Sequence, residues 1–197
     1  MKQHYDVAII GGGIGALMCA HRLAECAPGL SVAVMEKGAP LSGRSCPIVA
    51  GKVKSCAIME GVGGAGAFSD GKYIISCEYG GWLPDFLPAK TVLDYIEQAD
   101  RILVSFGATT ERFAPDDGLK RLCLQHDLHM QQATVKHLGT DANFATMVRL
   151  SDYLQDRCDI LPHTAVTDVS RDSHELTVRS AQGESRVTAD RIVFAGG

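Results

Sequence analysis

The residues best suited to chemistry lie in a glycine-rich turn near the N-terminus. Residues 11–16, GGGIGA, fit the spacing G-x-G-x-x-G/A. In this pattern the first glycine permits a tight turn, the second lets the backbone approach a pyrophosphate, and the small third residue lets a helix pack closely on a strand. The phosphates would meet unpaired N–H groups and the positive end of the helix dipole. The residues predicted to form this site are Gly11, Gly13, Ile14, Gly15 and Ala16.

A carboxylate follows at the spacing that such a site requires. Glu36 stands twenty residues after Ala16. A carboxylate there accepts hydrogen bonds from ribose hydroxyls and disfavours a 2′-phosphate, so the sequence predicts a dinucleotide site and disfavours NADP within it. Lys37 either approaches an adenosine ribose or phosphate or is a solvated loop lysine. Arg44 carries the same ambiguity, its functional alternative being a charged partner for the pyrophosphate or for Glu36.

These residues need a strand, a helix and a second strand to position them. Residues 5–10, YDVAII, are a short apolar run with β-branched side chains, which is typical of a buried parallel strand. Residues 14–27 place apolar side chains on one helical face, and Pro28-Gly29 ends that helix. Residues 31–35 are the second strand. Together the three elements have the size of one right-handed crossover.

The remainder of the chain mixes a long loop, helices and a β-meander. Residues 37–72 are glycine-rich and lack sustained periodicity, which is typical of a functional loop. Amphipathic spacing predicts a helix through residues 92–103 that ends at Gly107. Further helices are predicted at 117–127 and 142–157, and strands at 129–137 and 160–161. Alternation then predicts a three-stranded meander over 165–170, 175–179 and 185–188, followed by a buried strand at 191–195.

Composition narrows the class of protein. The 197 residues are 46% hydrophobic and 21% charged, with a net charge of −4, which is an ordinary globular mixture. The acidic balance argues against nucleic acid as a partner, since no basic patch can neutralise phosphates. The apolar run over residues 7–20 is shorter than the roughly 20 residues that a membrane span needs. We therefore expect a cytoplasmic protein without a membrane span.

The cysteines indicate a reducing compartment rather than a disulfide framework. Seven are spread irregularly along the chain, and their odd number favours free thiols. Cys46 and Cys56 are conceivable as a redox disulfide or as part of a metal site. They lack CxxC spacing and are too few for a tetrahedral thiolate site, so loop cysteines without a role are the favoured interpretation, and no metal site is predicted.

The second half of the chain separates FAD from NAD as the cofactor. A plain NAD dehydrogenase usually continues with alternating strands and helices. This chain instead inserts a glycine loop and helices, and then a meander that leads into RIVFAGG, residues 191–197. In this it resembles the two-dinucleotide-binding-domain flavoproteins of the glutathione reductase type, in which a meander precedes a strand ending in A-x-G. The resemblance implies FAD as the cofactor, with Gly196 in that second signature and the backbone at Val166 facing the adenine.

A narrower resemblance comes from the middle of the chain. The segments RSCP (44–47), CAIM (56–59), GVGGAGAFSDGKY (61–73) and HLGTD (137–141) are similar to uncharacterised bacterial FAD-dependent dehydrogenases. This resemblance implies that Gly64, Ala65, Ser69 and Asp70 lie along the flavin pyrophosphate and ring. Small residues allow close backbone approach, and the serine hydroxyl and the carboxylate can bond ribityl or ring polar atoms.

The expected fold class is α/β: a Rossmann-like FAD/NAD(P)-binding domain with a mainly parallel sheet, a three-stranded β-meander packed as a separate antiparallel layer, and a helical insertion. Residues 1–88 would form the first part of the FAD-binding domain. Residues 89–157 would form the helical insertion, part of a substrate domain, and residues 158–197 the return to the FAD-binding domain. Ligand is expected outside the carboxyl ends of the parallel strands.

Three functions remain open on the sequence alone. The leading hypothesis is a flavoenzyme that uses bound FAD for hydride or electron transfer with a small-molecule substrate or electron acceptor, and NAD(P)H as a candidate electron donor. No acid, base or nucleophile is assigned, and oligomeric state is open. The second hypothesis is a truncated, non-catalytic remnant that binds FAD or ADP-ribose. The third is an NAD-binding regulatory module.

Overall fold

The computed structural model of the chain describes residues 1–44, 58–77, 80–130 and 133–197. Cys46 and Cys56 lie outside these residues. The chain divides into two compact units, one built from residues 1–68 and 147–197 and the other from residues 69–146. The predicted domain boundaries after residues 88 and 157 stay predictions. The two units are described separately.

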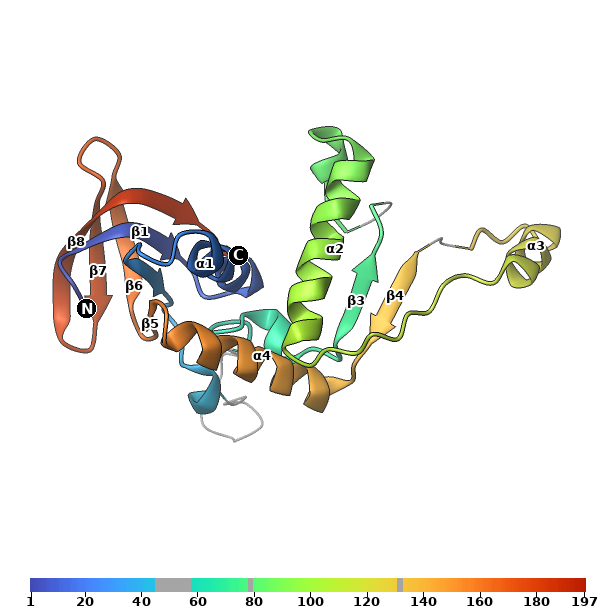
Figure 1. Cartoon of the computed structure of the whole chain (residues 1–197), viewed down its shortest axis with the longest axis horizontal. Coiled ribbons are helices and arrows are strands. Elements are labelled where there is room, and N and C mark those ends of the chain that lie inside the picture. The colour runs from blue at the N-terminus through green and yellow to red at the C-terminus, as the bar shows by residue number, and fades with distance from the viewer. Residues whose placement is uncertain (45–57, 78–79, 131–132) are drawn as a thin grey trace. The chain divides into compact units, whose positions relative to one another are not determined.

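The first unit is a six-stranded sheet with the strand order β5-β2-β1-β8-β7-β6 (Figure 1). Four strands are parallel: β1 (His4–Ile10), β2 (Val32–Met35), β5 (Asp159–Leu161) and the second half of β8 (Gly183–Phe194). Strands β6 (Ala165–Ser170) and β7 (Glu175–Ser180) are antiparallel. Helix α1 (Ile14–Cys26) connects β1 to β2. The predicted strand–helix–strand unit and the α/β fold class are confirmed.

The buried strands explain why this unit folds. Strands β1 and β2 pair in register Val7↔Val32 and Ile9↔Val34, and all four of these side chains are buried. Their branched side chains suit strands covered on both faces. A core cluster also joins the parallel strands to the meander, and it contains Tyr5, Ala8, Ala33, Met35, Leu176, Val178, Val187 and Ala189.

Strand β8 corrects two predictions about the end of the chain. Residues 185–188 and 191–195 were expected to be separate strands, and the meander a separate layer. Residues 183–194 form one strand instead, and the meander belongs to the same sheet. The reason is a change of partner at Thr188, which pairs with Glu175 of β7 on one side and His4 of β1 on the other. A strand that changes partners in this way needs no turn, so its polar residues do not mark a break.

The second unit combines helices with a two-stranded antiparallel sheet. Helices α2 (Ala89–Ser105) and α3 (Asp117–Gln125) lie in it, and α4 (Thr140–Gln155) begins there. Strand β3 (Lys72–Ile75) pairs with β4 (Thr134–His137), and α2 lies beside β3 (Figure 1). The three predicted helices are confirmed. Strand β4 is shorter than the predicted strand at 129–137, and β3 was not predicted.

A buried ion pair holds this second unit together. The ammonium of Lys136 on β4 is fully buried and lies 2.6 Å from a carboxylate oxygen of Asp100 on α2, which is 4% exposed. The other oxygen of Asp100 accepts a hydrogen bond from Arg112 at 2.8 Å. Because both charges are removed from water, each depends on its partner, and loss of either is costly. Within the described part of the chain, no helix is both long and apolar enough to cross a membrane.

Candidate dinucleotide-binding site

A pocket of about 610 Å³ lies at the carboxyl ends of the parallel strands of the first unit. This volume is within the range of roughly 300–1,000 Å³ found for small-molecule sites. Its walls come from five segments that are far apart in the sequence: residues 10–15 after β1, residues 35–37 after β2, the loop over 59–66, residues 164–166 at the start of β6, and residues 195–197 after β8. The position agrees with the location predicted for a ligand.

The glycines of the turn serve two different purposes. Gly11 has a φ of +102°, and a Cβ added there would lie 2.7 Å from the backbone oxygen of Ala195. The fold itself therefore requires a glycine at this position, because the end of β8 approaches the turn so closely. A Cβ added at Gly13 or Gly15 would meet nothing within 4 Å. Because these two residues have no side chain, space is left in the pocket, and the packing of the core does not depend on them.

The first turn of α1 is suited to an anion. Gly13 is the N-cap residue in an extended conformation, without a side-chain capping bond, and the first turn carries no acidic residue. The helical bonding begins with the N–H of Leu17, which donates to the Gly13 oxygen at 3.1 Å. The preceding N–H groups, together with the positive end of the helix dipole, can hold a phosphate. Ile14 lines the pocket, whereas Ala16 is fully buried on the helix face packed in the core.

Glu36 is tied to the backbone by three hydrogen bonds. Glu36 is among the residues that line the pocket, although the residue is only 7% exposed. One oxygen accepts from the N–H of Gly12 at 2.6 Å, and the other accepts from Gly38 at 2.7 Å and Gly61 at 3.1 Å. A carboxylate offers about four acceptor positions. Glu36 therefore fixes the turn to the neighbouring loop and keeps acceptor capacity for a hydroxyl group; the backbone role was not predicted.

The loop over residues 61–64 packs directly on the glycine turn. The N–H of Gly63 donates to the Gly12 oxygen at 2.8 Å. A Cβ on Gly64 would lie 3.0 Å from the Cα of Gly13, and both Gly63 and Gly64 have positive φ angles. Only glycine combines these backbone conformations with such close approach at little cost. The loop thereby brings Gly64 and Ala65 to the pocket wall.

The charged residues predicted near the pocket have different surroundings. Lys37 lines the pocket, its side chain is 62% exposed, and its ammonium lies 3.0 Å from a Glu60 oxygen. Arg44 is not among the residues that line the pocket. Its guanidinium donates to the backbone oxygens of Ile58, Val62 and Gly64. Burial lowers the pKa of Arg44, and the carboxylate of Glu36 opposes that shift.

Two predicted positions, Val166 and Gly196, also line the pocket. Ser69 and Asp70 belong to the second unit. The Ser69 hydroxyl accepts from the Gly71 N–H at 3.2 Å. Asp70 lies 2.7 Å from Lys72, and this hydrogen bond lowers the pKa of Asp70. The roles of these residues as cofactor contacts stay predictions. Twelve further residues line the pocket that were not predicted as site residues: Ile10, Gly12, Met35, Met59, Glu60, Gly61, Gly63, Gly66, Thr164, Ala165, Ala195 and Gly197. The glycine spacing around residue 61 offered a signal for part of them.

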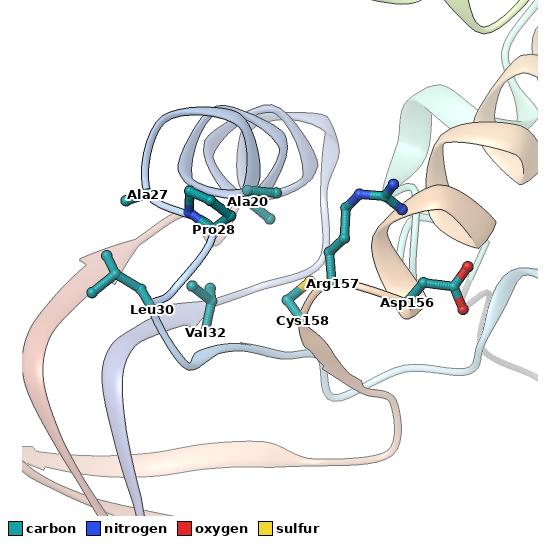
Figure 2. Close-up of a pocket in the computed structure, with 9 residues that line it drawn as sticks. Ala20, Ala27, Pro28, Leu30, Val32, Asp156, Arg157 and Cys158 are labelled. Carbon is teal, nitrogen blue, oxygen red and sulfur yellow. The ribbon is translucent and has the colours of Figure 1, made fainter.

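A second cavity in the first unit has a volume of about 190 Å³ and is lined mostly by apolar residues, together with Asp156, Arg157 and Cys158. Figure 2 shows that the side chains of Asp156 and Arg157 point away from the apolar side chains of Leu30 and Val32 that form its other wall. Burial raises the pKa of the Cys158 thiol there to about 11. Because the thiolate is the reactive form, this burial disfavours nucleophilic chemistry at Cys158.

The fold and the site define a dinucleotide-binding domain of the doubly wound type. Residues 5–197 match the family described as pyridine nucleotide-disulphide oxidoreductase, and the chain belongs to that family. The predicted resemblance to the two-dinucleotide-binding-domain oxidoreductases is thus confirmed. No curated protein matches the sequence.

Solved structures share the fold at low sequence identity. The 3-ketosteroid-delta4-(5alpha)-dehydrogenase from Rhodococcus jostii RHA1 has a TM-score of 0.61 and 13% identity, covering 98% of this chain and 46% of that one. The p-nitrophenol 4-monooxygenase from Pseudomonas putida DLL-E4 has a TM-score of 0.52 and 16% identity, and the match covers 100% of this chain and 42% of that one. Glycine oxidase from Bacillus cereus ATCC 14579 has a TM-score of 0.50 and 20% identity, and the match covers 98% of this chain and 55% of that one. The chain spans only 42% to 55% of these three proteins.

Among the described residues, no three His, Cys, Asp or Glu side chains are grouped so that they could hold a metal ion. The described side chains around the pocket include one carboxylate tied to backbone N–H groups and one ion pair, Lys37 with Glu60. We assign no acid, base or nucleophile among the described residues that line this pocket.

Proposed function

We propose that this chain is the FAD-binding part of an oxidoreductase. The observation that carries the proposal is the convergence of the glycine turn, the uncapped start of α1 and Glu36 on one pocket at the carboxyl ends of the parallel strands. Family membership supports it. When bound, FAD supplies hydride or electron transfer, and the protein binds, orients and shields it.

The residues of the pocket fit the parts of a dinucleotide. The unpaired N–H groups at the start of α1 would hold the pyrophosphate in the space left by Gly13 and Gly15. The remaining acceptor capacity of Glu36 would serve a ribose hydroxyl. The backbone at Val166 would face the adenine, and the wall formed by Gly64, Ala65 and Gly196 would flank the rest of the ligand. Ser69 and Asp70 stay candidate flavin contacts on the resemblance alone.

The reaction partners belong to the same proposal. A small-molecule substrate or electron acceptor would exchange electrons with the flavin, and NAD(P)H is the electron donor to test first, because the family takes its name from pyridine nucleotides. The substrate stays open, since one fold serves many reactions. A cytoplasmic location stays a prediction.

NAD is the second candidate ligand, because the glycine turn and an acceptor for ribose hydroxyls suit it equally well. Thermal unfolding of the purified protein with FAD, ADP or NADH separates the two. Ligands that bind the folded state raise its unfolding temperature. We expect FAD to stabilise more than NADH at equal concentration. Stabilisation by NADH alone would favour the NAD-binding module, and no shift with any of the three would reject a dinucleotide site.

A further inference from the structure

Arg44 is a half-buried cation, and among the described residues its hydrogen bonds all go to backbone oxygens. One guanidinium nitrogen donates to Val62 at 2.8 Å and to Gly64 at 2.7 Å, and the other terminal nitrogen donates to Ile58. The guanidinium carbon lies 4.6 Å from the centre of the Phe68 ring. The Nε atom is buried without a hydrogen-bond partner among the described residues. This planar group thus gathers three carbonyls of the 58–64 loop around one positive charge.

Two of the peptides whose oxygens accept from Arg44 carry the N–H groups of Gly63 and Ala65, and both of these residues line the pocket. A peptide group is planar and trans, so its N–H points away from its oxygen. The peptide whose oxygen is Val62's carries the N–H of Gly63, which donates to the Gly12 oxygen at 2.8 Å. The peptide of that Gly12 oxygen carries in turn the N–H of Gly13. Two peptide groups joined by a hydrogen bond therefore connect the Arg44 guanidinium to Gly13, which lines the pocket.

A second, shorter connection runs through Gly64. Its oxygen accepts from Arg44, and the N–H of the same peptide belongs to Ala65, which also lines the pocket. The oxygens of Val62 and Gly64 face the cation, and the Gly12 oxygen faces the N–H of Gly63, so the N–H end of each peptide points away from the cation. Hydrogen-bonded peptides in a protein interior polarise one another, and the cation strengthens the series.

We propose that Arg44 is a positioning residue for the anionic part of a bound dinucleotide: it fixes the 58–64 loop and directs the Gly13 and Ala65 N–H groups at the pyrophosphate without touching it. The inference rests on the proposed function, since it requires a pyrophosphate in this pocket. The sequence analysis considered a direct contact of Arg44 with the pyrophosphate. The proposal differs from it, because the oxygens of Ile58, Val62 and Gly64 already accept from three of the four terminal guanidinium N–H groups.

The test compares the Arg44→Met and Arg44→Lys variants with the wild-type protein. Arg22→Met is the matched control, because Arg22 is exposed on α1 and does not line the pocket. Affinities for FAD and for ADP are measured by titration, and amide hydrogen exchange is measured without ligand. We expect Arg44→Met to lose about tenfold or more in affinity for both ligands, and Arg22→Met to lose less than about twofold. Arg44→Lys keeps the charge but not the planar fork, so its affinity should lie between.

Hydrogen exchange separates this proposal from the function on which it rests. In ligand-free protein, the amide of Gly63 should exchange faster in Arg44→Met, while the amides of β1 keep their protection. A folded Arg44→Met that binds both ligands as the wild type does, with Gly63 still protected, would overturn the proposal. If Arg44→Met does not fold, wild-type affinity and protection in Arg44→Lys would overturn it. If the wild type binds neither ligand, the proposed function fails. In that case, unchanged exchange at the Gly63 amide in Arg44→Met would also reject the proposed role of Arg44 in fixing the loop.

Discussion

Replacing Gly13 by glutamate should abolish cofactor binding and leave the fold intact. A Cβ at this position meets nothing within 4 Å, and Gly13 has a φ of −70°, which any residue can adopt. The added side chain therefore extends into the pocket rather than into the core. Its carboxylate would stand where a pyrophosphate is proposed to bind.

The size of the effect follows from charge repulsion. Two unit charges about 4 Å apart interact with about 4 kcal/mol at an effective dielectric constant of 20, which corresponds to roughly a thousandfold loss of affinity. Displacement of the ligand by the side chain itself adds to this loss. Gly29→Glu is the matched control, since a Cβ there also meets nothing within 4 Å and Gly29 does not line the pocket.

Equilibrium titration with FAD, followed by flavin fluorescence, measures the effect, and circular dichroism verifies that each variant is folded. We expect Gly29→Glu to bind FAD as the wild type does. A folded Gly13→Glu that binds FAD within about tenfold of the wild type would refute the placement of the pyrophosphate.

Three further predictions concern stability. Gly11→Ala forces a side chain into a backbone with a φ of +102° and a gap of 2.7 Å, so urea unfolding should show a loss of about 2 kcal/mol or more; unchanged stability would contradict the geometry. Asp100→Leu leaves the buried Lys136 without its carboxylate, and should cost about 3–5 kcal/mol, much of which is recovered in the double variant with Lys136→Met; strictly additive losses would show that the pair is not coupled. Burial raises the pKa of Cys158 from 9.0 to about 11, so the unfolded thiol ionises first and stability is lost as pH rises through this window. Unfolding at about pH 8 and about pH 10.5 should show a smaller loss in Cys158→Ala than in the wild type, and an equal loss would exclude this thiol as a cause.

The sequence predicted those parts of the fold whose signals are local. Residues 5–10 form a β-branched run between polar and glycine residues, and this pattern is enough to predict β1. The spacing from the glycine turn to Glu36 likewise predicted which strand ends meet at the pocket. Strand β3 was missed because its four residues are stabilised by pairing with β4, where Lys72 lies opposite His137. Such a distant partner leaves no local pattern.

The surroundings of the charged residues could not be predicted for a related reason. The three backbone donors to Glu36 and the three acceptors around Arg44 come mainly from the loop near residues 58–64, which reaches them only in the folded chain. Residue type indicated that each side chain could bind a ligand. It could not indicate that backbone groups already occupy most of the donors and acceptors.

The most direct test of whether this chain binds FAD is the visible absorption spectrum of the purified protein, followed by identification of any cofactor released on denaturation. We expect the absorption bands of an oxidised flavin and released FAD, either as purified or after addition of FAD. A colourless protein that also fails to take up added FAD would contradict this expectation.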